Sequence, residues 1–87
     1  MSAPDVNAIL TVLRSEFPLL RKKDLRANTP LLSAGLLDSF AIVTLVAALD
    51  TAFGMDVDVE KVEIEEFETA ATIAALCVRA AAAGKHD

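Results

Sequence analysis

The amino-acid sequence predicts an all-α protein, a small four-helix bundle of three long helices and one short helix. We expect a long ordered loop between the first two helices. The chain is 54% hydrophobic but has only three glycines and three prolines, a composition that favours helices. Apolar residues also recur at helical spacing in three segments that turn residues separate. With 87 residues there is material for one hydrophobic core, so residues 1–87 should form a single domain.

The first predicted helix begins near Pro4, which suits the first helical position and places Asp5 in the first turn. Its end is marked by Pro18, because a proline displaces the residue before it from helical geometry. Between these points the apolar residues fall on one face of a helix. That inward stripe consists of Val6, Ile9, Leu10, Leu13 and Phe17.

The connection over residues 19–37 is too apolar to be a flexible linker. Residues 28–30 and 33–35 supply turn chemistry. A long ordered connection in so small a domain also indicates a functional role. We expect its leucines to lie across the bundle and to contribute to the core; they are Leu19, Leu20, Leu25, Leu31, Leu32, Leu36 and Leu37.

The second predicted helix runs from about Ser39 to Phe53, and Gly54 can end it. Asp38 is a good N-cap, which places Ser39 in the first turn, where free N–H groups and the helix dipole favour a negative group. The helix is apolar around its circumference, so it either docks a partner or is covered by the long loop. We favour docking. The core stripe is Ile42, Leu45, Val46, Leu49 and Phe53, and Phe40, Val43 and Ala47 lie largely off it.

Residues 55–62 show an alternating, strand-like pattern in which acidic residues separate Val57 and Val59. No second strand is available for pairing, so we predict an extended loop that turns Val57 and Val59 inward. A short helical turn is expected at 64–67. Thr69 then caps a last helix that ends at Gly84, and residues 84–87 form a frayed tail. The inward stripe of this helix is Ile73, Leu76, Cys77 and Ala80.

Charge and composition exclude several classes of function. The net charge of −5 leaves no basic face that could bind nucleic acid. Charged residues interrupt every apolar run before it reaches membrane-spanning length, so we expect no membrane insertion. The N-terminus lacks a signal-peptide pattern, and a single cysteine, Cys77, cannot form an intramolecular disulfide. These features predict a cytoplasmic protein, and we expect it to be a monomer.

The sequence offers neither a catalytic set nor a metal site. The sole histidine, His86, lies in the terminal tail without a partner in sequence. No cationic residue is placed to lower the pKa of Cys77, so core packing is the favoured interpretation of that thiol. The acidic residues around the short third helix are either a solvated surface or a docking surface for a basic enzyme, and we assign Glu65 and Glu66 to the docking hypothesis.

The segment Gly35-Leu36-Leu37-Asp38-Ser39-Phe40 resembles the signature of the acyl carrier proteins, a phosphopantetheine-binding family that includes peptidyl and D-alanyl carriers. In that family an Asp-Ser dipeptide, usually followed by Leu, comes after a glycine-containing loop and opens the second helix. An isolated Asp-Ser pair would mean nothing. Further similarity at residues 53–57 and 67–73, together with the long first loop, extends the resemblance over nearly the whole chain.

The resemblance implies a covalent 4′-phosphopantetheine arm on Ser39, attached from coenzyme A by a phosphopantetheinyl transferase that recognises Asp38. The arm would hold an acyl or aminoacyl group as a thioester. The protein would perform no chemistry and would move the group from an activating ligase to an acyltransferase or condensing enzyme. The alternative is an unmodified helical interaction module with the same fold.

Two departures from the family pattern bear on the pathway. Phe40 stands where leucine is usual, and the second helix lacks the acidic residues that fatty-acid carriers present to basic enzymes. Docking should therefore depend more on apolar contact than on charge. This favours a specialised pathway, of the D-alanyl, peptidyl or secondary-metabolite kind, over housekeeping fatty-acid synthesis, although the cargo itself is not specified. The predicted docking residues are Leu37, Phe40, Val43, Ala47, Glu65 and Glu66.

Overall fold

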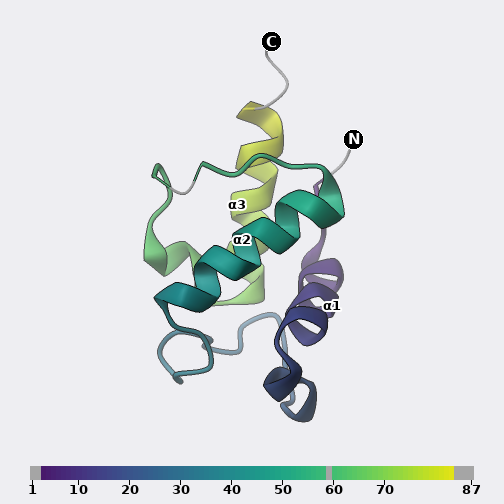
Figure 1. The fold of residues 1–87 in the computed structure, drawn as a ribbon, viewed down its shortest axis with the longest axis vertical. Helices are drawn as coiled ribbons and strands as arrows, with labels where there is room; N and C mark the ends of the chain where they lie inside the picture. Colours follow the sequence, from purple (N-terminus) through teal and green to yellow (C-terminus); the bar gives the residue numbers. More distant parts are fainter. Residues whose placement is uncertain (1–2, 59, 84–87) are drawn as a thin grey trace.

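The computed structural model describes residues 3–58 and 60–83, and over these residues it is all-helical, without strands. Three α-helices are present there: α1 (Val6–Glu16), α2 (Ser39–Phe53) and α3 (Ala70–Ala83). Two short 3-10 helices, η1 (Pro18–Lys22) and η2 (Ile64–Phe67), lie in the connections. Helix α1 contacts both α2 and α3, and η2 packs against α3 (Figure 1). The predicted all-α class is thus confirmed for the described chain.

Helix α1 begins later than the sequence pattern predicted. Asp5 has extended backbone geometry, and its carboxylate accepts a hydrogen bond of 2.9 Å from the Ala8 N–H, which makes Asp5 the N-cap. The prediction that Pro4 opens the helix and that Asp5 lies in its first turn is therefore wrong, because the side-chain cap fixes the start at Val6. Pro4 is buried just before the cap.

The hydrophobic core is shared between the helices and the loops that cross them. The connection between α1 and α2 contributes four buried leucines, as expected from its composition. Leu19 is an exception, since it is 81% exposed: Leu20 points inward from η1, and its neighbour on this tight turn points outward. The buried core comprises Ile9, Leu10, Val12, Leu13, Leu20, Leu25, Leu31, Leu37, Ile42, Leu45, Val46, Leu49, Val57, Phe67, Ala70, Ile73, Leu76 and Cys77.

Local chemistry determines the remaining boundaries. Gly54 adopts the left-handed conformation, with φ of 63°, and ends α2 as predicted. The Asp50 carboxylate accepts a hydrogen bond of 3.1 Å from the Val57 N–H, which turns Val57 into the core. Thr69 caps α3 through a bond of 3.1 Å from the Thr72 N–H to its hydroxyl oxygen, as predicted. The predictions for Val59 and for residues 84–87 lie outside the described residues.

Candidate functional site

Ser39 is the first residue of α2 and is exposed to solvent. The helix starts there because the Asp38 carboxylate accepts a hydrogen bond of 2.8 Å from the Ala41 N–H. The first-turn N–H groups of a helix lack helical acceptors, and the macrodipole adds positive potential at this end. An exposed hydroxyl in this position leaves space for a bulky substituent, and the local field favours a phosphate group attached to it.

An exposed apolar surface follows Ser39 along α2. Phe40 is 85% exposed and Val43 is 64% exposed, and Ala47, one turn further on, is also exposed. These three side chains are accessible to a partner, as a docking face requires. Leu37 is not accessible: it is only 5% exposed and packs in the core, so we correct its assignment as a docking residue.

A small apolar cleft of about 200 Å³ lies beside Ser39, between α2 and η2. Phe67 is fully buried beneath it, and Ile64 stays half exposed at its edge. The cleft offers apolar contact next to Ser39, whose side chain is the one polar side chain among its lining residues. Its lining residues are Ser39, Ile42, Val43, Val62, Ile64 and Phe67.

A second and larger hollow, of about 540 Å³, runs along the other side of α2 toward α1. Its wall is built mostly from small side chains of α2, and Glu16 supplies the single charge of its lining. Val43 lines both hollows, so it stands on the ridge between them. The remaining lining residues are Thr44, Ala47, Ala48, Thr51 and Ala52.

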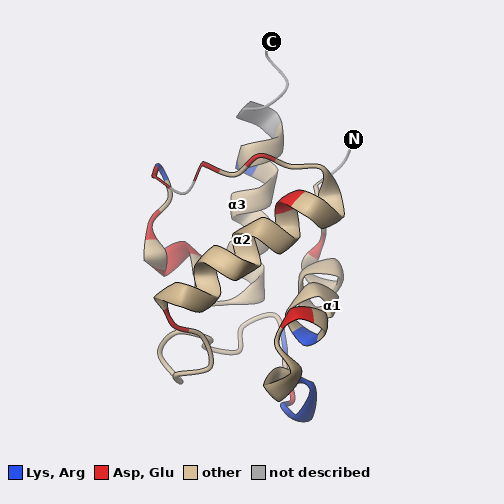
Figure 2. Ribbon diagram, in the orientation of Figure 1, with Lys and Arg blue, Asp and Glu red and all other residues tan. Residues whose placement is uncertain are grey.

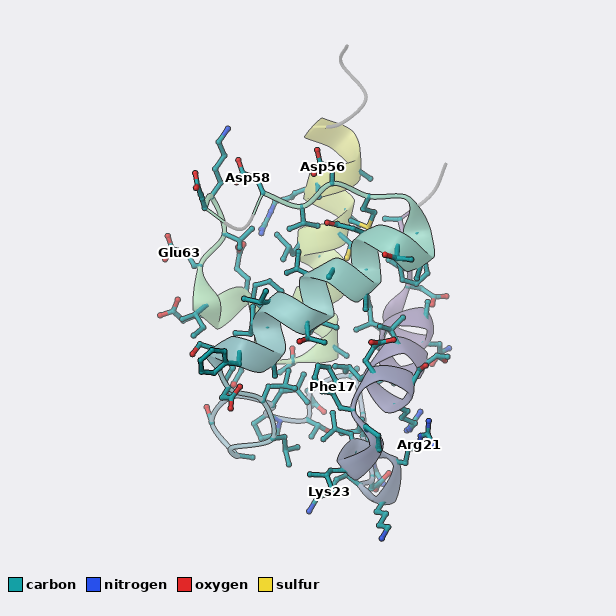
Figure 3. The ribbon with its side chains drawn as sticks, in the orientation of Figure 1. Phe17, Arg21, Lys23, Asp56, Asp58 and Glu63 are labelled. Carbon is teal, nitrogen blue, oxygen red and sulfur yellow. The ribbon has the colours of Figure 1, made fainter. Side chains whose placement is uncertain are left out.

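The exposed residues of α2 itself carry no charge. In Figure 2 this helix is uncharged along most of its length, whereas acidic residues follow one another in the loop after it and in η2. Figure 3 shows Asp56 and Asp58 toward one end of the molecule and Arg21 and Lys23 toward the other. Electrostatic recognition of a basic partner would therefore involve the loop and η2 more than α2 itself.

The two acidic residues predicted to dock partners have different environments. Glu65 is exposed on η2. Glu66 instead forms an ion pair with Arg79 of α3, and it completes a capping box with Glu63 at the start of η2. Glu66 therefore holds η2 against α3, and Glu65 is the more accessible of the two carboxylates.

Sequence reasoning missed the most extensively hydrogen-bonded carboxylate near the site, that of Glu68. It accepts bonds of 2.9 Å from the N–H groups of both Leu32 and Ser33, and a further bond from the Ser33 hydroxyl. These bonds, that of the Ser33 hydroxyl foremost, hold the pKa of Glu68 below its usual value. Glu68 lies more than thirty residues after Leu32 and Ser33, so no local pattern in the sequence could have indicated the contact.

The structure agrees with the core interpretation of Cys77, which is fully buried. Desolvation, with a smaller effect from the negative charge of Asp50, raises the pKa of this thiol to about 11, so it is not a nucleophile at neutral pH. Among residues 3–58 and 60–83, no group of His, Cys, Asp and Glu side chains is arranged to hold a metal ion. Nor does this part of the chain contain a helix with the length and apolarity needed to cross a membrane.

Comparison with protein families shows which family the chain belongs to. The model of the phosphopantetheine attachment site matches residues 7–77, a stretch that holds all of α1 but its first residue, all of α2 and the first part of α3. The chain belongs to the phosphopantetheine attachment site family. A search of curated proteins found no match.

Membership in this family confirms the resemblance to acyl carrier proteins and the predicted cofactor, a covalently bound 4′-phosphopantetheine. Proteins with this domain are carriers, and they interact with a phosphopantetheinyl transferase and with biosynthetic enzymes. The residues present fit such a group: an exposed serine hydroxyl opens α2, next to the apolar cleft described above. When bound, the arm supplies a thiol on which an acyl group can be held as a thioester.

Proposed function

We propose that Ser39 is the attachment point of the 4′-phosphopantetheine arm and that the protein carries acyl or aminoacyl groups on it. The observation that supports this most directly is the position of Ser39, exposed and first in a 15-residue helix that Asp38 caps. The family match spans this position. In this proposal the protein catalyses nothing itself and delivers its thioester to enzymes that do.

Each residue around Ser39 has a separate role in the proposal. The hydroxyl of Ser39 forms the phosphodiester, while the first-turn N–H groups and the dipole of α2 stabilise its negative charge. Asp38 keeps α2 starting at this serine through its bond to Ala41, and it also forms part of the surface that the transferase recognises. The cleft above Phe67 provides apolar contact for the part of the arm nearest the protein.

The proposed docking surface is apolar and consists of Phe40, Val43 and Ala47, with Glu65 at its margin. A large exposed aromatic side chain next to a modification site is a strong candidate for an interface anchor. No exposed residue of α2 is charged, and acidic residues gather on η2 and the loop before it, so partners should be held mainly by apolar contact. This supports a specialised pathway, with an activating ligase and a downstream acyltransferase or condensing enzyme as partners.

The proposal is tested by intact-protein mass spectrometry after incubation with coenzyme A and a promiscuous phosphopantetheinyl transferase. Wild-type protein should gain the mass of one arm, and Ser39→Ala should gain none. The variant Ser15→Ala is the matched control, because it removes another exposed serine hydroxyl, on α1 and outside the loop that leads to Ser39. Modification of Ser39→Ala, or no modification of a folded wild type, would refute the assignment of Ser39.

The second candidate is an unmodified interaction module with the same fold, and the exposed apolar face of α2 is the observation in its favour. It predicts that Ser39→Ala leaves every function of the protein intact. A cytoplasmic location and a monomeric state remain predictions from the sequence.

A further inference from the structure

The segment that leads into Ser39 is attached to the start of α3 through one side chain. The Glu68 carboxylate accepts two backbone N–H groups, those of Leu32 and Ser33, through its Oε1 atom, and the Ser33 hydroxyl through Oε2. A charged acceptor with three converging donors makes stronger hydrogen bonds than a neutral one. The contact joins residues more than thirty positions apart.

Hydrogen bonds continue from this contact toward the helix start. The Leu32 carbonyl accepts a bond of 3.0 Å from the Gly35 N–H, and the Leu31 carbonyl accepts bonds of 2.8 Å from Leu36 and 3.0 Å from Leu37. Gly35 has a φ of 75°, which closes this turn and suits glycine. Residues 31–37, which lead to Asp38 and Ser39, therefore form one hydrogen-bonded turn, and the Glu68 carboxylate holds residues 32 and 33 of that turn.

We propose that Glu68 is a positioning residue for the loading of Ser39. This inference rests on the proposed function, because it concerns the serine that receives the arm. Glu68 does not touch the serine. It holds the preceding loop in the one arrangement in which Asp38 and Ser39 are presented together to the transferase.

The contact can be removed without removing the fold. Two backbone hydrogen bonds join the same segments independently of the Glu68 side chain, from Leu31 N–H to the Glu68 carbonyl at 2.6 Å and from Ala71 N–H to the Ala27 carbonyl at 2.9 Å. Leu31 and Leu37 are also buried in the core on either side of the turn. Loss of the carboxylate should thus broaden the ensemble of loop conformations while α2 and α3 persist.

The expected kinetic consequence is specific. If only a fraction of molecules presents Ser39 correctly, the apparent affinity of the transferase falls by that fraction, while saturated turnover is unchanged. Glu68→Ala should therefore raise the KM for the carrier about tenfold and leave kcat within about twofold. Glu68→Gln retains Oε1 as an acceptor, and its amide can donate to the Ser33 oxygen, so it should recover most of the loss.

The experiment compares wild type, Glu68→Ala, Glu68→Gln and Asp24→Ala in arm attachment from coenzyme A. Asp24 is an exposed carboxylate that pairs with Arg26 in the connection after η1, so its variant matches the change in charge and should load like wild type. Amide hydrogen exchange at Leu32 and Ser33 reports the loop in each protein, and it should be faster in Glu68→Ala alone. Ser33→Ala removes a single bond of the three and serves as a milder variant if Glu68→Ala does not fold.

Two results separate this inference from the function on which it rests. A folded wild type that accepts no arm would refute the proposed function. The second result is that wild type is loaded, and that Glu68→Ala or Ser33→Ala shows faster exchange at residue 32 but an unchanged KM. This result would overturn the positioning role alone. A fall in kcat at constant KM would overturn it as well, because it would mean a change at the reacting serine instead of in its presentation.

Discussion

Replacement of Phe40 by alanine should separate the stability of the protein from its recognition. The side chain is 85% exposed, so only the remaining sixth or so of its surface contributes to folding. Aromatic side chains offer about 150–250 Å² for burial, so about 30 Å² is covered in the free protein. At about 25 cal/mol per Å² this is worth less than about 1 kcal/mol, and the better helix propensity of alanine offsets about half of it.

The same area has a different effect when a partner covers it. Burial of the other ~170 Å² against an enzyme would supply at most about 4 kcal/mol, and alanine scans of interface anchors commonly give losses of about 2 kcal/mol or more. Phe40→Ala should thus raise the transferase KM for the carrier by about thirtyfold, the equivalent of 2 kcal/mol. Its free energy of unfolding should stay within about 1 kcal/mol of wild type.

The free energy of unfolding is measured by urea titration followed by far-ultraviolet circular dichroism, because the chain has no Trp or Tyr for fluorescence. The KM of the transferase for the carrier is measured by steady-state arm attachment. Leu19→Ala is the matched control, because Leu19 is 81% exposed but lies on η1, away from α2. A KM within twofold of wild type for Phe40→Ala would refute docking through this residue. A loss of more than about 2 kcal/mol in unfolding free energy would contradict its exposed position.

Three further outcomes follow from the hydrogen bonds and the buried thiol. Asp38→Ala removes the cap of α2 and should lower the unfolding free energy by about 1 kcal/mol in urea titration, whereas Asp38→Asn should retain most of it. Because its folded pKa is depressed, Glu68 stabilises the fold fully above its ordinary value of 4.5, and this stabilisation is lost as the pH falls further. Thermal unfolding midpoints of wild type and Glu68→Gln should therefore converge on acidification; a constant difference would contradict the contact. Cys77, with a pKa of about 11, should resist iodoacetamide at pH 8 until urea unfolds the chain; rapid native-state alkylation would refute its burial.

The elements that the sequence predicted well are those determined by neighbouring residues. The caps at Asp38 and Thr69 and the left-handed glycine at 54 depend on side chains and backbone within one helical turn. The start of α1 was predicted wrongly because Pro4 and Asp5 both favour a helix N-terminus, and only the observed bond to Ala8 decides between them.

Features that depend on the path of the long connection could not be predicted from the sequence in the same way. Its leucines carry no periodic pattern, so the sequence could not show that Leu37 turns into the core while Leu19 turns out of it. The same limit applies to Glu68, one of five glutamates within nine residues. Only the fold reveals that it contacts the loop, whereas Glu66 pairs with Arg79 and Glu65 stays exposed.

The distribution of charge around Ser39 gives the helix and the loop different roles in recognition. Asp50, the one acidic residue within α2, has its carboxylate engaged by the Val57 N–H, so it serves the fold more than a partner. The exposed acidic groups instead follow α2 in the loop and in η2. Charges at the margin of an interface mainly accelerate encounter, whereas buried apolar anchors determine how long a complex lasts. In our proposal the loop and η2 therefore attract a basic enzyme, and Phe40 and Val43 retain it while Ser39 is in reach.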